Sequence, residues 1–127
     1  MSYSTEVLAD SPAVYLTLDD TSGTTVADSS GNSRALTSAN CTLNQATVMP
    51  SGAASYDLNG TNSSASVADA AWQRPSAFTI EAWVRADSLS GFRAIGAKDR
   101  SSTGWAFYLI DGQLSLYTNG AAHTYTG

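Results

Sequence analysis

Two tight-turn dipeptides divide the last part of the chain into three short segments. Asp111-Gly112 and Asn119-Gly120 interrupt the stretch GWAFYLIDGQLSLYTNGAAHTYT, which covers residues 104–126. Both dipeptides favour the positive φ angles of type I′ turns, which join neighbouring antiparallel strands. Such turns fix which segments become neighbours, so they constrain the fold more than any other local feature. The sequence therefore predicts a three-stranded antiparallel meander at this end.

Short strands and turns continue through the rest of the chain. Loops such as DDTSGTT and ADSSGNS are rich in turn residues, and Pro12 should end a short N-terminal helix at about residues 3–10. The expected strands lie at residues 13–18, one or two within 34–48, 54–60, 65–67, 78–85 and 93–98, with an irregular or single-turn connection at 69–75. This order predicts an all-β fold, a sandwich or barrel, as one domain over residues 1–127.

The strand expected at residues 78–85 has the clearest pattern in the chain. In FTIEAWVRAD, apolar residues alternate with a mixed set that includes a tryptophan, a glutamate and an arginine. One face of a sandwich strand meets the opposite sheet, and the other face lies outside. The pattern predicts core positions for one set and outer positions for the other: Phe78, Ile80, Ala82 and Val84 inside, and Thr79, Glu81, Trp83 and Arg85 outside.

Charge patterning excludes two classes of partner. Charged residues make up only 13% of the 127 residues, while 43% are hydrophobic, enough for a core. The net charge is −5, from 6 basic and 11 acidic residues, and the basic residues form no cluster. Binding to nucleic acid or to an anionic membrane needs such a cluster. We therefore expect no nucleic acid and no membrane among the partners.

The single cysteine and the N-terminal stretch bear on the compartment. Cys41 is alone, so no intrachain disulfide can form, and we expect a buried, inert thiol. The first twenty residues have neither a basic region nor a continuous apolar run, so they do not predict a signal peptide. The chain is expected to be made in the host cytoplasm and to stay there unless a particle carries it out.

Three stretches resemble one family of jelly-roll domains. They are VLADSPAVYLTLDDTSGTTVADSSGN (residues 7–32), YDLNGTNSSASV (56–67) and FTIEAWVRADSLSG (78–91), and the meander continues in the same style. Their order and spacing are similar to those of the laminin-G-like, concanavalin A-like lectin/glucanase family. The resemblance implies an antiparallel two-sheet jelly-roll sandwich. Family domains usually continue with further strands, so this chain is either a fragment or a sandwich shortened at its C-terminus. A shortened sandwich would leave an open edge for a partner chain.

The resemblance implies several functions, because this fold hosts lectins, adhesion modules, glycosidases and structural modules. Glycosidases of this fold use acidic residues close together on one strand. Here Glu81 and Asp87 are six residues apart, about 20 Å along a regular strand, too far for the paired carboxyls of hydrolysis. The sequence contains no nucleophile motif for which His123 could act as the base. We therefore expect no enzyme and no catalytic residue.

Metal and sugar sites have weaker signals. Asp28 and Asn32, with Asp19 and Asp20 nearby, could offer oxygens to calcium, but Asx turns explain such residues without an ion. We expect no metal and no cofactor. Aromatic side chains could stack on a sugar ring, or they could pack inside the protein or against a neighbouring subunit. The candidate ligand-binding residues are Trp83, Trp105, Tyr108 and Tyr117.

Two functions remain in view from the sequence. The first is a non-enzymatic structural or adhesion component of a tailed-phage virion, such as a decoration, fibre or tail-associated module. Its partners would be copies of itself or other virion proteins, and its location the virion. The alternative is a carbohydrate-binding module that recognises a bacterial surface glycan or polysaccharide.

Overall fold

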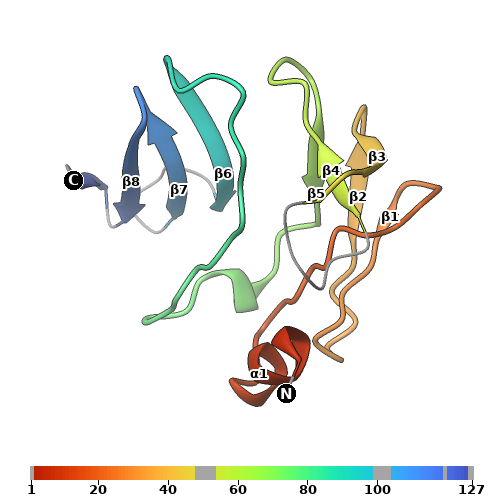
Figure 1. Cartoon of the computed structure of the whole chain (residues 1–127). Helices are drawn as coiled ribbons and strands as arrows, with labels where there is room; N and C mark the ends of the chain where they lie inside the picture. Colours follow the sequence, from red (N-terminus) through yellow and green to blue (C-terminus); the bar gives the residue numbers. More distant parts are fainter. Residues whose placement is uncertain (1, 48–53, 99–103, 119, 126–127) are drawn as a thin grey trace. The chain divides into compact units, whose positions relative to one another are not determined.

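The chain forms two compact antiparallel β units. The computed structural model describes residues 2–47, 54–98, 104–118 and 120–125. The first unit covers residues 1–68 and the second covers residues 69–127. All strand pairings in the described ranges are antiparallel, which confirms the predicted all-β class (Figure 1).

The first unit opens with a short helix whose ends follow the sequence signals. Helix α1 covers Tyr3–Ala9, and the Ser2 hydroxyl caps its start by accepting a hydrogen bond from the Thr5 N–H at 3.3 Å. Ser11 has a positive φ of 53° just before Pro12, which disfavours further helical turns. The helix expected at residues 3–10 is therefore confirmed.

Short strands make up the rest of the first unit. They are β1 (Thr25–Val26), β2 (Leu36–Ala39), β3 (Thr42–Gln45), β4 (Ser55–Asp57) and β5 (Ser64–Ser66). One sheet has the order β1-β2-β5, and β3 pairs with β4. The strands expected near residues 34–48, 54–60 and 65–67 are confirmed. The strand expected at residues 13–18 is wrong, because it forms only one isolated bridge, Leu16 to Asp28.

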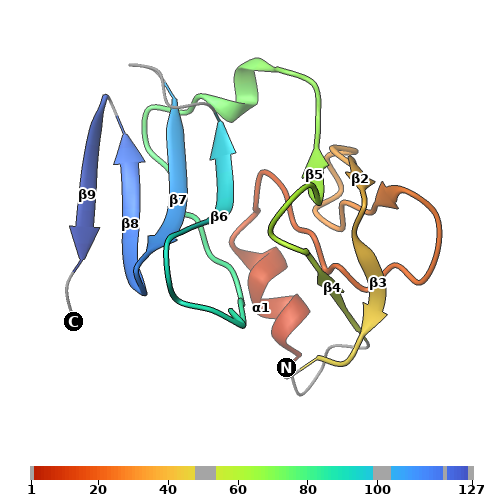
Figure 2. The same cartoon turned by 90° about the horizontal axis from the view of Figure 1, so that it is seen from above.

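The second unit is a four-stranded meander. A 3₁₀ turn, η1 (Ala71–Gln73), is followed by β6 (Phe92–Lys98), β7 (Trp105–Ile110), β8 (Gln113–Thr118) and β9 (Ala121–Tyr125), paired in that order (Figure 2). Asp111 and Gly112 both have positive φ, at 48° and 79°, as a type I′ turn requires. The predicted meander is confirmed. Asn119, from the second expected turn, lies outside the described residues.

The register of the meander gives the second unit two distinct faces. Tyr108 lies opposite Ser115, and Ala106 lies opposite Tyr117, so these four side chains share one face. Tyr108 is 4% exposed and Ser115 is fully buried. The neighbours of Tyr108 on β7 point to the other face, which contains Trp105, Phe107 and Leu109. The core of this unit therefore includes Tyr108 and Ala106.

The strand predicted at residues 78–85 is wrong in this structure. The segment lies outside every β-ladder of the described residues. Its expected core face is also wrong, because Phe78 is 40% exposed and Val84 is 56% exposed. The physical reason is that alternation shows which faces a strand would have, whereas a strand exists only when a neighbour bonds its backbone. In the described residues, β6 pairs with β7 and not with this segment.

Candidate functional site

Polar contacts fix the connection that leads into the second unit's sheet. The Asp69 carboxylate accepts from Arg74 at 2.7 Å and from Lys98 at 3.0 Å. These two hydrogen bonds, from Arg74 first and then from Lys98, lower the pKa of Asp69. The Gln73 side chain accepts a hydrogen bond from the Ala70 N–H at 3.0 Å. The carbonyl of Gln73 is thereby placed where an indole can reach it.

Trp105 is the indole that uses this carbonyl. Its Nε1–H donates to the Gln73 oxygen at 3.0 Å. The ring of Phe78 lies against it, with 5.7 Å between the ring centroids, and Gly96 lies under its six-membered ring. The indole is half-buried. These contacts favour the packing alternative for Trp105 over a sugar platform.

The two candidate tyrosines lie on the opposite face of the sheet from Trp105. Tyr108 is buried against Phe92, whose ring centroid is 4.7 Å away. Tyr117 shares the face of Tyr108 and is half-buried. The register therefore separates Trp105 from both tyrosines, so these three predicted residues do not line one cleft. Burial gives Tyr108 no open ring face.

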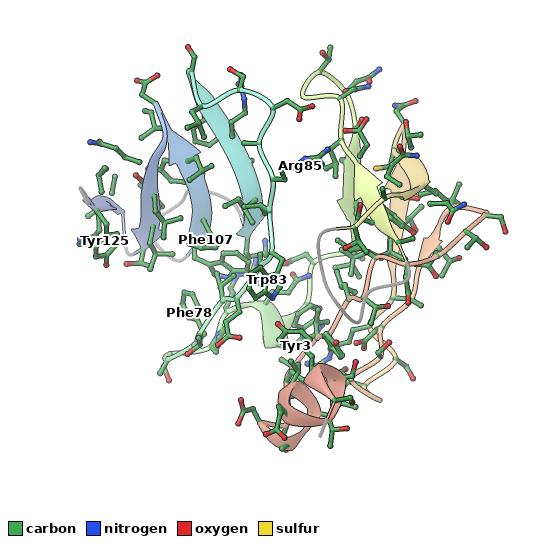
Figure 3. All side chains as sticks on the ribbon, viewed as in Figure 1. Tyr3, Phe78, Trp83, Arg85, Phe107 and Tyr125 are labelled. Atoms are coloured by element: carbon green, nitrogen blue, oxygen red, sulfur yellow. The ribbon has the colours of Figure 1, made fainter. Side chains whose placement is uncertain are left out.

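Trp83 is the exposed member of the predicted set. It is 68% exposed, and every residue from Glu81 to Gly91 is exposed. Figure 3 shows Phe78, Trp83 and Arg85 projecting from the extended chain that precedes β6. We call residues 78–86 the exposed segment. An exposed tryptophan beside charged side chains is typical of protein interfaces.

The chain that contains the exposed segment is held at two points, one near each end of β7. Phe78 contacts Trp105 at the start of β7. Beyond the other end, the Asp111 N–H donates to the Gly91 carbonyl at 3.1 Å, and the Gly91 N–H donates to the Asp111 carboxylate at 2.8 Å. The chain from Phe78 to Gly91 thus extends over the length of β7 and is anchored near both ends. Its middle remains exposed.

A hollow at the β7–β8 turn contains an aromatic residue that the sequence analysis missed. The hollow is shallow and open, with a volume of about 630 Å³. Tyr125 is 60% exposed there and lies directly across the ladder from Leu114. The lining residues are Leu89, Asp111, Gly112, Gln113, Leu114 and Tyr125. The spacing of the two predicted hairpin turns already placed Leu114 opposite Tyr125, so this signal was present in the sequence.

The loop considered for calcium is a hydrogen-bonded turn. The Asp28 carboxylate accepts from the N–H groups of Tyr15, Ser30 and Arg34 at 3.0, 3.0 and 2.8 Å, and from the Ser30 hydroxyl at 2.9 Å. Partial burial would raise the pKa of Asp28, but these hydrogen bonds outweigh it and lower the pKa to about 2. Asn32 donates its amide to the Pro12 carbonyl at 3.0 Å. Protein N–H groups therefore use the Asp28 oxygens that an ion would need.

Residues considered for catalysis are dispersed within the described structure. Glu81 and Asp87 are both exposed, and Glu81 lies outside any strand. His123 is exposed on β9, and Cys41 is half-buried with its thiol directed at the carbonyls of Ala39 and Ser64. Among the described residues, no three His, Cys, Asp or Glu side chains gather as metal ligands would. Neither described helix is long and apolar enough to cross a membrane.

Comparison with known proteins adds one family match. The family described as the concanavalin A-like lectin/glucanases superfamily matches residues 59–127, just over half of the chain. This range includes the FTIEAWVRADSLSG stretch and the meander, whereas the resemblance at residues 7–32 lies outside it. No curated protein and no solved structure matches the chain.

Proposed function

The chain belongs to the concanavalin A-like lectin/glucanases superfamily, and from this premise we propose that it is a non-enzymatic structural or adhesion module. It assembles through protein contacts as a component of a tailed-phage virion. The superfamily fits both structural and lectin-like roles, so the choice between them rests on the surface of this chain.

The exposed segment carries the proposal. Trp83 and Val84 are 68% and 56% exposed side by side, in a stretch whose pattern suits a strand. A polar ligand site would need convergent side chains, whereas an apolar strand-like segment suits a second protein surface. Only 13% of the residues are charged, which also lowers the free-energy cost of removing water from charged groups when an interface forms.

The solution mass of the purified chain tests assembly. Light scattering across a concentration series should give a mass above that of one chain at the higher concentrations. A mass of one chain at every concentration would contradict assembly through copies of itself. Trp83→Ser should reduce the association, because it removes the largest exposed apolar side chain of the segment. Tyr3→Ser on α1 is the control, since it also removes a partly exposed aromatic ring.

The virion setting has a separate test. It derives from the family resemblance. Mass spectrometry of purified particles, produced from the genome that encodes the chain, should find its peptides in a fixed ratio to the major structural proteins. Their absence from the particles would contradict this setting while leaving assembly to the light-scattering test.

The hollow at the β7–β8 turn favours a second candidate function, carbohydrate binding. Tyr125 offers a ring for stacking, and Asp111 and Gln113 offer hydrogen-bonding groups beside it. A glycan array should then show binding that Tyr125→Ala removes. His123→Ala, on the same strand and also exposed, should leave the binding unchanged. Equal loss in both variants, or no binding by the wild type, would contradict this function.

A further inference from the structure

The exposed segment is complementary to itself when two copies run antiparallel. We propose that residues 80–86 pair with the same residues of a second copy, about a two-fold axis through Trp83. This pairing deepens the proposed assembly function and rests on it, because it names the partner and the register. The occupant of the exposed segment is a second copy of this chain.

The outer set of side chains matches across this axis. With Trp83 opposite its own copy, Glu81 lies opposite Arg85 of the second copy, and Arg85 lies opposite its Glu81. Opposite residues in an antiparallel pair share a face, with Cβ atoms about 4.5–5.5 Å apart. The pairing therefore makes two identical ion pairs that flank a tryptophan pair. Both charged side chains are exposed in the single chain and available for this contact.

The inner set matches in the same register. Ile80 lies opposite Ala86, and Ala82 lies opposite Val84, so the even-numbered positions bring apolar side chains together. A β-ladder that sorts apolar and charged side chains onto separate faces is the arrangement that sheets favour. The alternation that predicted a strand is thereby used between chains.

Neighbouring registers are disfavoured by the same residues. A shift of two positions in one direction puts Glu81 opposite Trp83 and Arg85 opposite Thr79, so both ion pairs are lost. The opposite shift puts Glu81 against Asp87, two like charges. Shifts by one position place the charged set against the apolar set. Charge complementarity thus selects the register centred on Trp83.

The backbone on either side of Trp83 is available for pairing. For Phe78 to Ala82 and Val84 to Ala86, the structure gives no backbone hydrogen bond to any described residue. No residue from 78 to 86 has a positive φ, so the segment is compatible with a strand. The anchors at Phe78 and Gly91 lie outside residues 80–86. Unbonded stretches of backbone such as 80–82 and 84–86 are a template for a second strand.

Charge reversal tests the register. The two variants are Glu81→Arg and Arg85→Glu. When either variant pairs with its own copy, like charges lie opposite each other at both of the 81–85 positions. We expect each to dimerise about tenfold or more weakly than the wild type. Mixing the two variants in equal amounts restores opposite charges at both positions, so the mixture should dimerise like the wild type. A seven-residue pairing buries less than a standard interface, so the concentration series must reach the high micromolar range.

Controls separate this pairing from other causes. Glu6→Arg on α1 makes the same charge change away from the segment and should dimerise like the wild type. Circular dichroism of each variant should match the wild type, because these side chains are exposed. As a second measurement, Trp83→Cys in a Cys41→Ser background should form an interchain disulfide in air. Arg85→Cys in that background should not, because its two copies would lie about 13 Å apart along the paired strands.

The outcomes distinguish the pairing from assembly in general. Three results support the pairing: weaker dimerisation of each single variant, wild-type dimerisation of their mixture, and an interchain disulfide at position 83. A wild type that assembles while the reversed variants assemble equally well, or a mixture that stays weak, overturns the register and leaves the proposed assembly standing. A wild type that remains a single chain throughout overturns both the pairing and the assembly of copies with one another.

Discussion

Asp28 is the best-connected carboxylate in the described structure, and its four hydrogen bonds tie Tyr15, Ser30 and Arg34 into one loop. Its folded pKa of about 2 lies below the ordinary value of 3.8. Because the pKa is lower in the folded state, the ionised Asp28 carboxylate stabilises the fold. This stabilisation is fully present above pH 3.8 and is lost as the pH falls through about 2. After allowance for solvent screening, we expect this contribution to be about 1–2 kcal/mol.

Asp28→Asn tests this contribution, because an amide cannot accept from all of these donors. Urea unfolding at pH 7 should show a loss of about 1–2 kcal/mol. Between pH 4 and pH 2, the wild type should lose stability more steeply than the variant. Asp10→Asn, an exposed residue at the end of α1, is the control and should change little. Parallel pH curves for Asp28→Asn and the wild type would contradict the role of this carboxylate.

Tyr56 offers a second residue-scale prediction, at alkaline pH. Its hydroxyl donates to the Asp20 carboxylate at 2.9 Å. Burial first, and then this hydrogen bond and the charge of Asp20, raise the pKa of Tyr56 to about 12. Because the pKa is higher in the folded state, the neutral Tyr56 hydroxyl stabilises the fold. This stabilisation is present below the unfolded pKa of about 10 and is lost as the pH rises through about 12. Tyr56→Phe should remove one late-ionising tyrosine from an ultraviolet titration and cost about 1 kcal/mol at pH 7. An unchanged titration would refute the assignment.

At the scale of elements, the β7–β8 hairpin should depend on its glycine. Gly112 has a φ of +79°, and an added Cβ would lie 3.4 Å from the Leu89 side chain. Gly112→Ala should therefore destabilise the protein by about 1–2 kcal/mol through backbone strain. Gly96→Ala, on β6 of the same sheet, is the control, because its Cβ would make only an ordinary contact with Trp105. Equal unfolding midpoints for the two variants would contradict the strain.

The same scale shows which elements a sequence can predict. The β7–β8 hairpin was predictable because Asp111 and Gly112 bring two strands together within a few residues. The segment at residues 78–85 was not, because its pattern contains no information on which backbone would bond it. The candidate aromatic residues are divided between two faces of the sheet for a reason that the sequence contains. Trp105 and Tyr108 have opposite parity on one strand, so their separation onto two faces could have been read from the sequence.

At the scale of the whole molecule, the sequence predicted the all-β class, because turn residues and alternation recur along the chain. It predicted the family because three stretches resemble that family. The core was less predictable. Tyr108 and Ala106 are buried, whereas Phe78 and Val84 are exposed, although all four are apolar or aromatic residues in strand-like patterns. Which patterned segment is covered depends on long-range contacts that local sequence does not encode. Trp83 is exposed, as predicted, but so are Phe78 and Val84, so its exposure does not distinguish an outer face.

Hydrogen exchange across the molecule tests this distribution of order. Amides of β7 should exchange slowly, because this strand bonds to neighbours on both sides. In a dilute sample, the amides of residues 80–82 and 84–86 should exchange fast, since their backbone is unbonded among the described residues. At concentrations where the mass doubles, alternate amides in this range should become slow, because an antiparallel ladder bonds residues in alternating pairs. Slow exchange there in the dilute sample would mean that this backbone is bonded within one chain, and would argue against its pairing with a second copy.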